Sequence, residues 1–294
     1  LRAARARLGP DAVLTGWQCL AAESDAAGVT LRFRDRAPVR GGVAIACDGI
    51  HSVLRKQVHP TEGAPRYSGY NMWRGVTVRP RILTGASMIR AGWLKTGKMV
   101  IYPIRDDVDG EGRQLVNWVA EIETPRHLER DWNRDGRLED FLPAFADWHF
   151  DWLDVPALIR GAERVLEFPM VDQDPLARWG FGRVTLLGDA AHPMVPRGSN
   201  GAGQAILDAR ALCDCLLRHG ATEAALAEYE ALRRPPTTEV VLTNRRNPPD
   251  AILREVFERT GDRPFARIAD VISEDELRAL SEGYKAVAGL RRGA

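Results

Sequence analysis

The sequence lacks several features that would place it in broad classes of protein. Its four cysteines show no CxxC pairing, so neither a disulfide framework nor a zinc ribbon is predicted. No run approaches the ~20 consecutive apolar residues of a membrane span, and no signal peptide opens the chain. An excess of one charge is also missing, with 41 Lys and Arg against 40 Asp and Glu. That balance argues against nucleic-acid or membrane partners, and we expect a cytoplasmic protein.

An initiator methionine is absent as well, because the chain begins at Leu1 and its first methionine is Met72. We therefore expect a fragment or an incomplete gene model. The 294 residues, of which 45% are hydrophobic, still suffice to build the core of one large domain or two smaller ones.

Strand and helix patterns alternate at both ends of the chain, around a sheet-rich middle. Residues 67–165 hold six of the eight tryptophans, which marks a change in character. This order predicts an α/β domain with a second, antiparallel-sheet domain inserted into it. The expected elements are the end of a helix at 1–8, strands at 12–22, 29–34, 42–47, 98–104, 115–122 and 184–187, and helices at 138–145 and 201–219.

The helix expected over 201–219 has apolar residues at helical spacing, and Gly220 is predicted to end it. Ser273 to Glu276 fits a capping box before a final helix. A second aromatic set at helical spacing is expected to pack in a core, and consists of Phe145, Trp148 and Trp152. The predicted buried face of the 201–219 helix consists of Ala202, Ala205, Ile206, Ala209, Leu212, Cys213, Leu216 and Leu217.

The most informative segment runs from Val184 to Ala205 and joins a short strand, a loop of small residues and a helix. Asp189 stands at the carboxyl end of the strand, which is where open α/β sheets bind ligands. The small residues of the loop let the backbone approach a flat ligand closely. The loop enters a helix whose first N–H groups and dipole favour negative charge. The segment therefore predicts a site for a ligand with hydroxyl groups and an anionic part.

This segment resembles the second FAD-binding motif of the group A flavoprotein aromatic hydroxylases, the family of p-hydroxybenzoate hydroxylase. The resemblance implies that Gly188 and Asp189 meet the ribityl chain of FAD, whose hydroxyl groups Asp189 holds. It also implies that the loop runs beside the isoalloxazine ring. The implied ring contacts are Pro196 and Gly198 along the ring and the amides of Gly201, Ala202 and Gly203 at its N1/O2 edge.

A second segment, Cys47 to Arg55, follows the strand expected at 42–47. Asp-Gly after a strand is by itself a common turn. The segment is also similar to the family's Asp-Gly motif, which ends in Ser-x-x-Arg and serves FAD and nicotinamide-cofactor binding. The resemblance assigns Asp48, Gly49 and Arg55 to that motif. Two roles stay open for Arg55, a contact with a pyrophosphate or an ion pair with a surface carboxylate.

The middle of the chain resembles the phenazine-modifying branch of the family, typified by the 5-methylphenazine-1-carboxylate 1-monooxygenases. Three segments carry this resemblance, namely Asn71–Val76, Asp131–Asp140 and Phe168–Asp172. The family opens with a Gly-x-Gly-x-x-Gly whose helix start binds the FAD pyrophosphate, and this motif occurs nowhere in the chain. Because residues 1–9 match the helix that follows, we expect the first βαβ unit, of at least ~30 residues, to be truncated.

Other candidate sites have plainer structural interpretations. Asp131–Gly136 reproduces half of a calcium loop, but Leu142 stands where its final glutamate belongs, and we expect a turn. His192 and Ser199 lack the Gly-x-Ser-x-Gly elbow of a hydrolase. His51 and His59 have no metal-ligand partners at a recognisable spacing, so no metal site is predicted.

These observations predict an FAD-dependent monooxygenase with a two-domain α/β flavoprotein architecture. The resemblance implies that NADH or NADPH reduces FAD, and that one atom of O2 enters an aromatic small molecule while the other leaves as water. No catalytic residue is predicted, and substrate identity, the choice of nicotinamide cofactor and the oligomeric state stay open. Two alternatives also remain, a flavin oxidoreductase without oxygen insertion and an inactive fragment. The expected divisions are an FAD-binding part at 1–66, a substrate-binding sheet domain at 67–165, a second FAD-binding part at 166–246 and a helical region at 247–294.

Overall fold

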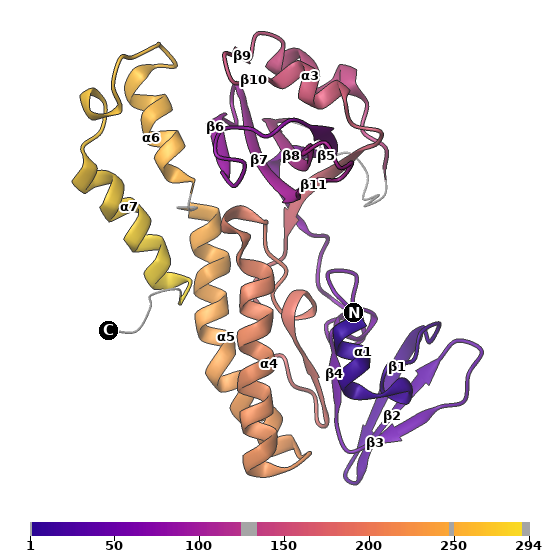
Figure 1. Ribbon diagram of the computed structural model, residues 1–294. Coiled ribbons are helices and arrows are strands. Elements are labelled where there is room, and N and C mark those ends of the chain that lie inside the picture. The colour runs from indigo at the N-terminus through magenta and orange to yellow at the C-terminus, as the bar shows by residue number, and fades with distance from the viewer. Residues whose placement is uncertain (1, 125–133, 247–249, 290–294) are drawn as a thin grey trace. The chain divides into compact units, whose positions relative to one another are not determined.

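The computed structural model describes residues 2–124, 134–246 and 250–289 (Figure 1). The chain folds into two compact units, which are described separately. The first contains Leu1–Ala64, Gln173–Met194 and Ser199–Thr243, and the second contains Pro65–Asp172, Val195–Gly198 and Asn244–Ala294. Each unit combines helices with strands, so the predicted α/β class is confirmed. The division into four parts stays a prediction.

The first unit joins a parallel strand pair to a small antiparallel sheet and several helices. The predicted strands at 42–47 and 184–187 are confirmed as a parallel pair, in which Val184 lies opposite Ala44. The strands are β1 (Cys19–Asp25), β2 (Gly28–Phe33), β3 (Val39–Gly41), β4 (Ala44–Ala46) and β12 (Val184–Leu186). The helices are α1 (Arg2–Leu8), α2 (Val53–Val58), α4 (Asn200–His219) and α5 (Glu223–Arg246), whose last residues belong to the second unit.

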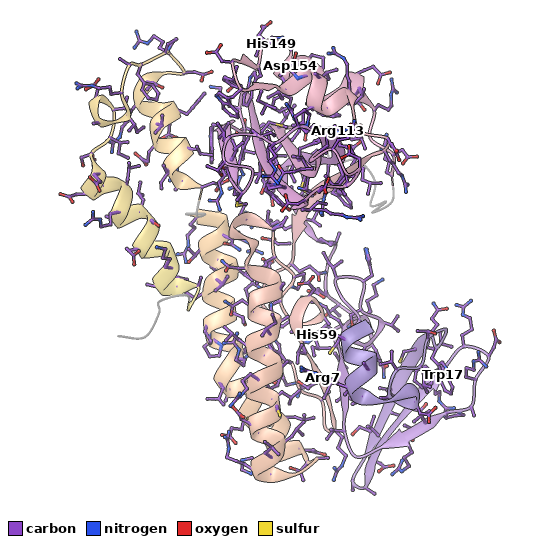
Figure 2. The ribbon with its side chains drawn as sticks, in the orientation of Figure 1. Arg7, Trp17, His59, Arg113, His149 and Asp154 are labelled. Carbon is purple, nitrogen blue, oxygen red and sulfur yellow. The ribbon has the colours of Figure 1, made fainter. Side chains whose placement is uncertain are left out.

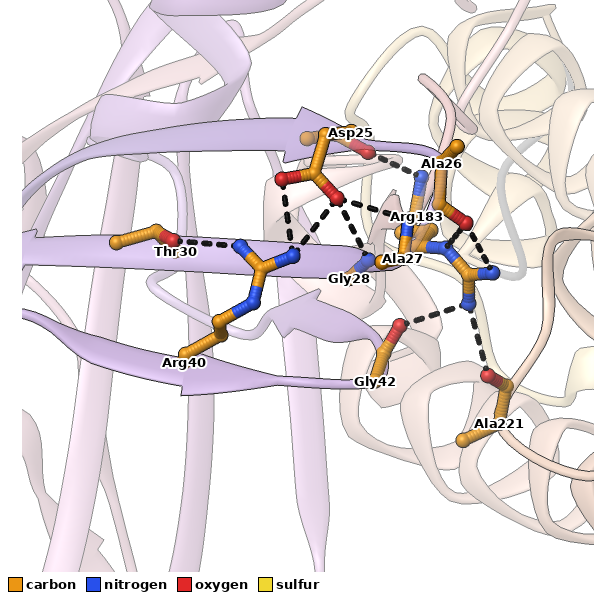
Figure 3. A network of polar contacts seen from close by, with 10 residues as sticks. Asp25, Ala26, Ala27, Gly28, Thr30, Arg40, Gly42, Arg183 and Ala221 are labelled. Carbon is orange, nitrogen blue, oxygen red and sulfur yellow. Dashed lines mark hydrogen bonds and ion pairs between the residues drawn. The ribbon is translucent and has the colours of Figure 1, made fainter.

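A network of arginines fixes the turn between β1 and β2 (Figure 3). Asp25 accepts hydrogen bonds of 2.8 and 2.9 Å from two N–H groups of the turn and is bound by Arg40. These contacts, chiefly the one with Arg40, lower the pKa of the Asp25 carboxyl to about 2. Arg183, just before β12, donates to three carbonyl oxygens from separate segments, namely those of Ala26, Gly42 and Ala221. The start of β12 is thereby tied to the hairpin.

The strand predicted at 12–22 is wrong in its first half. Pro10–Ala12 forms a single turn of 3-10 helix, and β1 begins only at Cys19. Gly16 lies between them with a φ of 77°, a left-handed conformation that interrupts an extended strand and that glycine adopts readily. The apolar residues at 13 and 14 therefore imitate a strand pattern without forming one.

The face that α4 buries also differs from the prediction. Ile206 and Leu217 are 71% and 80% exposed, and Cys213 is exposed. The apolar pattern predicted the wrong face because most of the side chains that α4 buries are polar and form hydrogen bonds. Gly220 follows the helix with a φ of 67°, as expected for the residue that ends it. The buried side chains recur every three or four residues and are mostly polar: Asn200, Gln204, Asp208, Leu212 and Cys215.

The second unit is organised around an antiparallel sheet with the strand order β11-β5-β8-β7-β6. The strands predicted at 98–104 and 115–122 are confirmed as β7 and β8. The bounds are β5 (Arg66–Arg79), β6 (Ile89–Trp93), β7 (Gly97–Arg105), β8 (Gln114–Glu123) and β11 (Val165–Asp172). A separate pair, β9 (His149–Phe150) and β10 (Leu153–Asp154), is closed by a contact of 3.3 Å between His149 and Asp154 (Figure 2). The helices are α3 (Val155–Arg160), α6 (Ala251–Thr260) and α7 (Glu274–Val287).

The helix predicted at 138–145 is replaced by two short 3-10 turns, Leu138–Asp140 and Leu142–Phe145. Pro143 has no N–H group to continue a helix through this segment. Phe145 is fully buried, as predicted, whereas Trp152 is 40% exposed and stacks on Phe150 at 5.3 Å. The calcium-loop resemblance at 131–133 lies outside the described residues.

The capping box before α7 is confirmed. The Ser273 N–H donates to Oε2 of Glu276 at 2.9 Å, and the Glu276 N–H donates to Oγ of Ser273 at 3.3 Å. Among the helices that the structure describes, none has the length and hydropathy that crossing a membrane requires.

Replacing Glu167 with glutamine is expected to stabilise the second unit. Glu167 lies in β11, is 2% exposed and accepts a hydrogen bond of 3.1 Å from Asn71. Burial raises the pKa of its carboxyl. The protonated carboxyl therefore stabilises the fold at low pH, and this stabilisation is lost as the pH rises through the raised pKa and the buried group becomes charged. Glutamine keeps the oxygen that Asn71 binds and carries no charge.

At pH 8 we expect the free energy of unfolding to rise by about 1 kcal/mol in Glu167→Gln, measured by urea denaturation. Little difference is expected at pH 4. Glu123→Gln is the control, because that side chain is exposed on β8. A variant less stable than the parent at pH 8 would contradict the prediction.

Candidate cofactor site

The parallel strands β4 and β12 bring two acidic residues to the same edge of the first unit. The Leu187 N–H donates to the carbonyl oxygen of Ala46 at 3.0 Å, which extends the pairing to the carboxyl ends of both strands. Asp48 follows β4 and Asp189 follows β12. Carboxyl ends of parallel strands form the ligand-binding edge of open α/β sheets. The fold therefore unites the two motifs that lie about 140 residues apart in the sequence.

Asp189 lies beside the first turn of α4. A Cβ atom placed on Gly201 would come within 3.6 Å of Oδ1 of Asp189. The Asp189 side chain is exposed, and no residue that the structure describes hydrogen-bonds its carboxylate. Gly188 has a φ of 61°, and a Cβ atom there would lie 3.2 Å from Cβ of Ala205. A glycine at 188 thus lets the loop pass close to α4 and leaves Asp189 facing outward.

The start of α4 offers open space to a ligand. No heavy atom lies within 4 Å of the position that a Cβ atom on Gly203 would occupy, and Ala202 is exposed. Backbone N–H groups in the first turn of a helix have no partner within the helix. In the second unit, Pro196 is exposed and Gly198 has a φ of 75°. The backbone at Gly198 therefore takes a left-handed turn that a larger residue would strain.

Asp48 and Gly49 form the turn that starts α2. The carboxylate of Asp48 accepts a hydrogen bond of 2.9 Å from the Val53 N–H, and Oγ of Ser52 accepts one of 2.9 Å from the Arg55 N–H. Gly49 has a φ of 75° and accepts the Ser52 N–H at its carbonyl. In this structure the Asp-Gly pair thus has a helix-capping role, and its predicted contact with a cofactor stays a prediction.

Arg55 is 2% exposed, and its guanidinium group is fully engaged within the first unit. Nη1 donates to the carbonyl oxygens of Ala190 and Ala191, both at 2.9 Å. Nε donates to Glu62 at 2.7 Å, and Nη2 binds the other oxygen of the same carboxylate. Of the two roles left open, the structure shows an ion pair, in which Arg55 is buried and Glu62 is partly buried. Arg55 therefore holds the loop that follows Asp189. Its effect on a bound cofactor would come from positioning this loop.

A buried polar network under that loop was not anticipated from the sequence. Nε2 of His192 lies 2.6 Å from Oδ2 of Asp208, and Nε of Arg233 donates to Oδ1 at 2.7 Å. Arg233 also donates to Gln204 at 2.7 Å, and the Gly188 N–H reaches Asp208 at 3.3 Å. Burial raises the pKa of Asp208, but the hydrogen bonds and charges of His192 and Arg233 outweigh it and lower the pKa overall. Side chains four residues apart lie on the same face of a helix. The spacing of Gln204 and Asp208 was therefore the sequence signal from which this network could have been predicted.

The residues of this edge fit FAD. The exposed carboxylate of Asp189 has no hydrogen-bond partner among the described residues and can accept hydrogen bonds from hydroxyl groups. The helix start beside it provides N–H groups and a positive dipole end, with space above Gly203. A donor set of this kind suits a ligand that combines a polyol chain with a ring that becomes anionic on reduction. Among the described residues, no group of three or more His, Cys, Asp or Glu side chains is arranged to hold a metal ion.

Comparison with known proteins identifies the family. A family model described as an FAD binding domain matches residues 1–244. The chain is 40% identical to the phenazine 1,6-dicarboxylic acid hydroxylase PhzS of Lysobacter antibioticus, over 98% of this chain and 70% of that protein. It is 38% identical to the 3-amino-4-hydroxybenzoate 2-monooxygenase PtnB3 of Streptomyces platensis, over 79% of this chain and 57% of that protein.

A solved structure is similar over nearly the whole chain. The Klebsiella pneumoniae protein HpxO, crystallised with FAD and uric acid, has a TM-score of 0.68 and 26% sequence identity, over 98% of this chain and 69% of that one. The chain therefore belongs to the group A FAD-dependent aromatic hydroxylases, and FAD is the cofactor of this family. The predicted family, cofactor and enzyme class are confirmed.

Proposed function

We propose that this monooxygenase acts on a carboxylated heteroaromatic compound of the phenazine type, using O2 and NADH or NADPH. Support comes from the 40% identity to a phenazine 1,6-dicarboxylic acid hydroxylase, which extends over 98% of the chain and so includes the sheet of the second unit. The observation that carries the cofactor site is the exposed carboxylate of Asp189, which no residue in the described part of the chain hydrogen-bonds, at the edge formed by β4 and β12.

In the proposed site, Asp189 accepts hydrogen bonds from the ribityl hydroxyl groups, and Gly188 keeps the loop close to α4. Pro196 and Gly198 line the isoalloxazine ring. The amides of Gly201, Ala202 and Gly203 face the N1/O2 edge of the ring, where the start of α4 stabilises negative charge. Asp48 and Gly49 hold the neighbouring turn, and Arg55 positions the loop after Asp189.

Bound FAD supplies the redox chemistry that links the nicotinamide cofactor, O2 and the substrate. The protein's own contribution is to orient the aromatic ring, to exclude water and to hold charge. The buried apolar cluster of Tyr70, Leu94, Met170 and Val195 in the second unit suits the first two tasks. No side chain is assigned as a general base.

Replacing Asp189 with alanine is expected to weaken FAD binding by about 10- to 100-fold. The variant loses hydrogen bonds between a carboxylate and hydroxyl groups, each worth about 1.5–3 kcal/mol, and every 1.4 kcal/mol is tenfold in affinity. The dissociation constant is measured by titrating FAD into the chain and following flavin fluorescence. Asp214→Ala is the matched control, because Asp214 is an acidic residue of α4 whose partner is the exposed Arg210. Equal FAD affinity in Asp189→Ala and the control would refute this assignment.

Oxygen insertion distinguishes the proposal from the two remaining alternatives. NADH consumption, peroxide release and hydroxylated product are measured together with a panel of phenazine carboxylates. Product formed in proportion to NADH supports a monooxygenase, whereas peroxide in equal amount to NADH with no product supports an oxidoreductase without oxygen insertion. A chain that stays colourless after incubation with FAD and purification would support an inactive fragment.

A further inference from the structure

A surface pocket in the first unit lies where the turn after β2 meets the segment before β1. Its volume is about 740 Å³, within the ~300–1,000 Å³ typical of small-molecule sites. Trp17 lies in its lining, beside the sheet of β1, β2 and β3 (Figure 2). The lining contains none of the residues assigned above to the FAD site. It consists of Gly16, Trp17 and Gln18 before β1 and of Arg34, Asp35 and Arg36 after β2.

Trp17 gives this pocket an aromatic wall whose position is fixed. Its indole ring packs edge-on against Phe33, with the ring centres 5.3 Å apart. The Arg34 N–H donates to the carbonyl oxygen of Gln18 at 2.9 Å, which joins the two lining segments. The Trp17 side chain is half-buried, so part of the indole stays open to a ligand. Nucleotide bases stack on aromatic side chains of this kind, because every base has a π-face.

The arginines in the lining differ from their neighbours in having no carboxylate partner. Arg34 and Arg36 are exposed and form no ion pair with a carboxylate in the described part of the chain. The guanidinium carbon of Arg36 lies 5.6 Å from the centre of the Trp17 ring, at the distance of a cation–π contact. The other two arginines between the start of β2 and the end of β3 are paired, Arg32 with Glu23 at 2.7 Å and Arg40 with Asp25 at 2.8 Å.

The charges of the lining suit a phosphate attached to a sugar. The two guanidinium groups exceed the single carboxylate, that of Asp35, by one positive charge. Guanidinium groups form strong, charge-assisted hydrogen bonds with phosphate oxygens. The Asp35 carboxylate is exposed and can accept a hydrogen bond from a ribose hydroxyl group. A flat base, a ribose and a phosphate together match the indole, the carboxylate and the two arginines.

The pocket also adjoins the edge at which the cofactor site lies. Cys19 follows the lining segment directly and begins β1. Burial raises the pKa of the Cys19 thiol, and the negative charge of Asp48 adds to this rise, so the two side chains are close. Asp48 stands at the carboxyl end of β4. A dinucleotide held at Trp17 would therefore begin beside the edge at which FAD is proposed to bind.

We propose that this pocket binds the 2′-phosphoadenosine end of NADPH, and that the enzyme uses NADPH in preference to NADH. Trp17 stacks on the adenine ring, while Arg34 and Arg36 bind the 2′-phosphate, which NADH lacks. The inference rests on the proposed function, because the ligand it names is the reductant of that reaction. It decides between the two nicotinamide cofactors that the sequence left open.

The test compares two probes, adenosine 2′,5′-bisphosphate and adenosine 5′-monophosphate, by isothermal titration calorimetry on the full 294-residue chain. The parent is expected to bind the bisphosphate at least about tenfold more tightly. The double variant Arg34→Gln/Arg36→Gln should lose most of this preference, which in the parent should also weaken with added salt. Trp17→Leu should weaken the binding of both probes about tenfold and leave the preference between them unchanged.

Matched controls replace side chains of the same kinds outside the lining. Arg32→Gln changes an exposed arginine of β2, and Trp152→Leu changes a tryptophan of the second unit that is 40% exposed. Neither should alter the binding of either probe. FAD is titrated into every variant as well, and its affinity should not change, because the lining is separate from the residues assigned to FAD.

The proposal is overturned if the parent binds the two probes equally, or if a folded Arg34→Gln/Arg36→Gln protein keeps the preference. A loss of FAD affinity in step with the loss of bisphosphate binding would also overturn it, because the pocket would then serve the adenosine part of FAD. Failure of the proposed function is distinguishable: probe binding would follow the variants as expected while no oxygenated product forms. Product formed equally well with NADH and NADPH would refute this site and keep the function.

Discussion

Replacing Asp208 with alanine is expected to lower the free energy of unfolding by about 3–5 kcal/mol. The Asp208 side chain is fully buried, and it receives Arg233 at 2.7 Å and lies 2.6 Å from His192. Its removal leaves the guanidinium group of Arg233, which is 13% exposed, without its carboxylate partner. Breaking one side of a buried ion pair is costly because the remaining charge stays desolvated. Few single substitutions in this chain should destabilise it more.

Urea denaturation of the parent and of two variants measures this effect. Asp214→Ala serves as the comparison, since it removes the same type of side chain from the same helix. Its ion pair with Arg210 is solvent-exposed, so its loss should change the free energy of unfolding little. If the free energy of unfolding fell equally in both variants, the buried network would stabilise α4 no more than an exposed ion pair does.

The pH dependence of the same pair of proteins provides a second readout. The folded pKa of Asp208 lies below its ordinary value of 3.8, so the pair's contribution is complete above about pH 4. That contribution disappears as the pH falls further through the folded pKa. The gap in stability between the parent and Asp208→Ala should therefore narrow below pH 4. A constant gap between pH 7 and pH 3 would contradict the assignment.

Sequence patterns predicted the strands around the cofactor site because the relevant information is local. The small apolar runs before Asp48 and Asp189 are buried strands, and both end where an aspartate begins a turn. Gly220 and the capping box at Ser273 are likewise local signals with a backbone cause. Their positions could be predicted without knowledge of the tertiary contacts.

The partners of the polar side chains could not be predicted in this way. Arg55 meets carbonyl oxygens more than 130 residues further along the chain, and Asp208 meets an arginine on another helix. Apolar periodicity assigned the wrong face to α4 because it gives Gln204 and Asp208 no weight as buried residues. Tertiary hydrogen bonds made those two positions interior and left Ile206 exposed.

The second large effect is expected from Arg55→Met. Methionine retains much of the apolar volume of the side chain but leaves Glu62, whose side chain is 19% exposed, without its cation, and the carbonyl oxygens of Ala190 and Ala191 without their donor. We expect the free energy of unfolding to fall by about 3–5 kcal/mol, measured by chemical denaturation. Arg55→Lys should recover only part of this loss, because an ammonium group cannot reproduce the planar fork that meets three acceptor groups at once.

Arg32→Met is the control for Arg55→Met, because it breaks an arginine–glutamate pair of the same chemistry that is exposed to solvent. Arg32 and Glu23 also form a bidentate pair in the first unit, with bonds of 2.7 and 3.0 Å, but their side chains are 52% and 58% exposed. An exposed pair of this kind is screened by solvent, so Arg32→Met should leave the free energy of unfolding nearly unchanged. Because Arg55 holds the loop after Asp189, Arg55→Met should also release FAD faster under conditions where the protein stays folded, whereas Arg32→Met should not. Equal FAD release from the two variants would show that the loop keeps its position without Arg55.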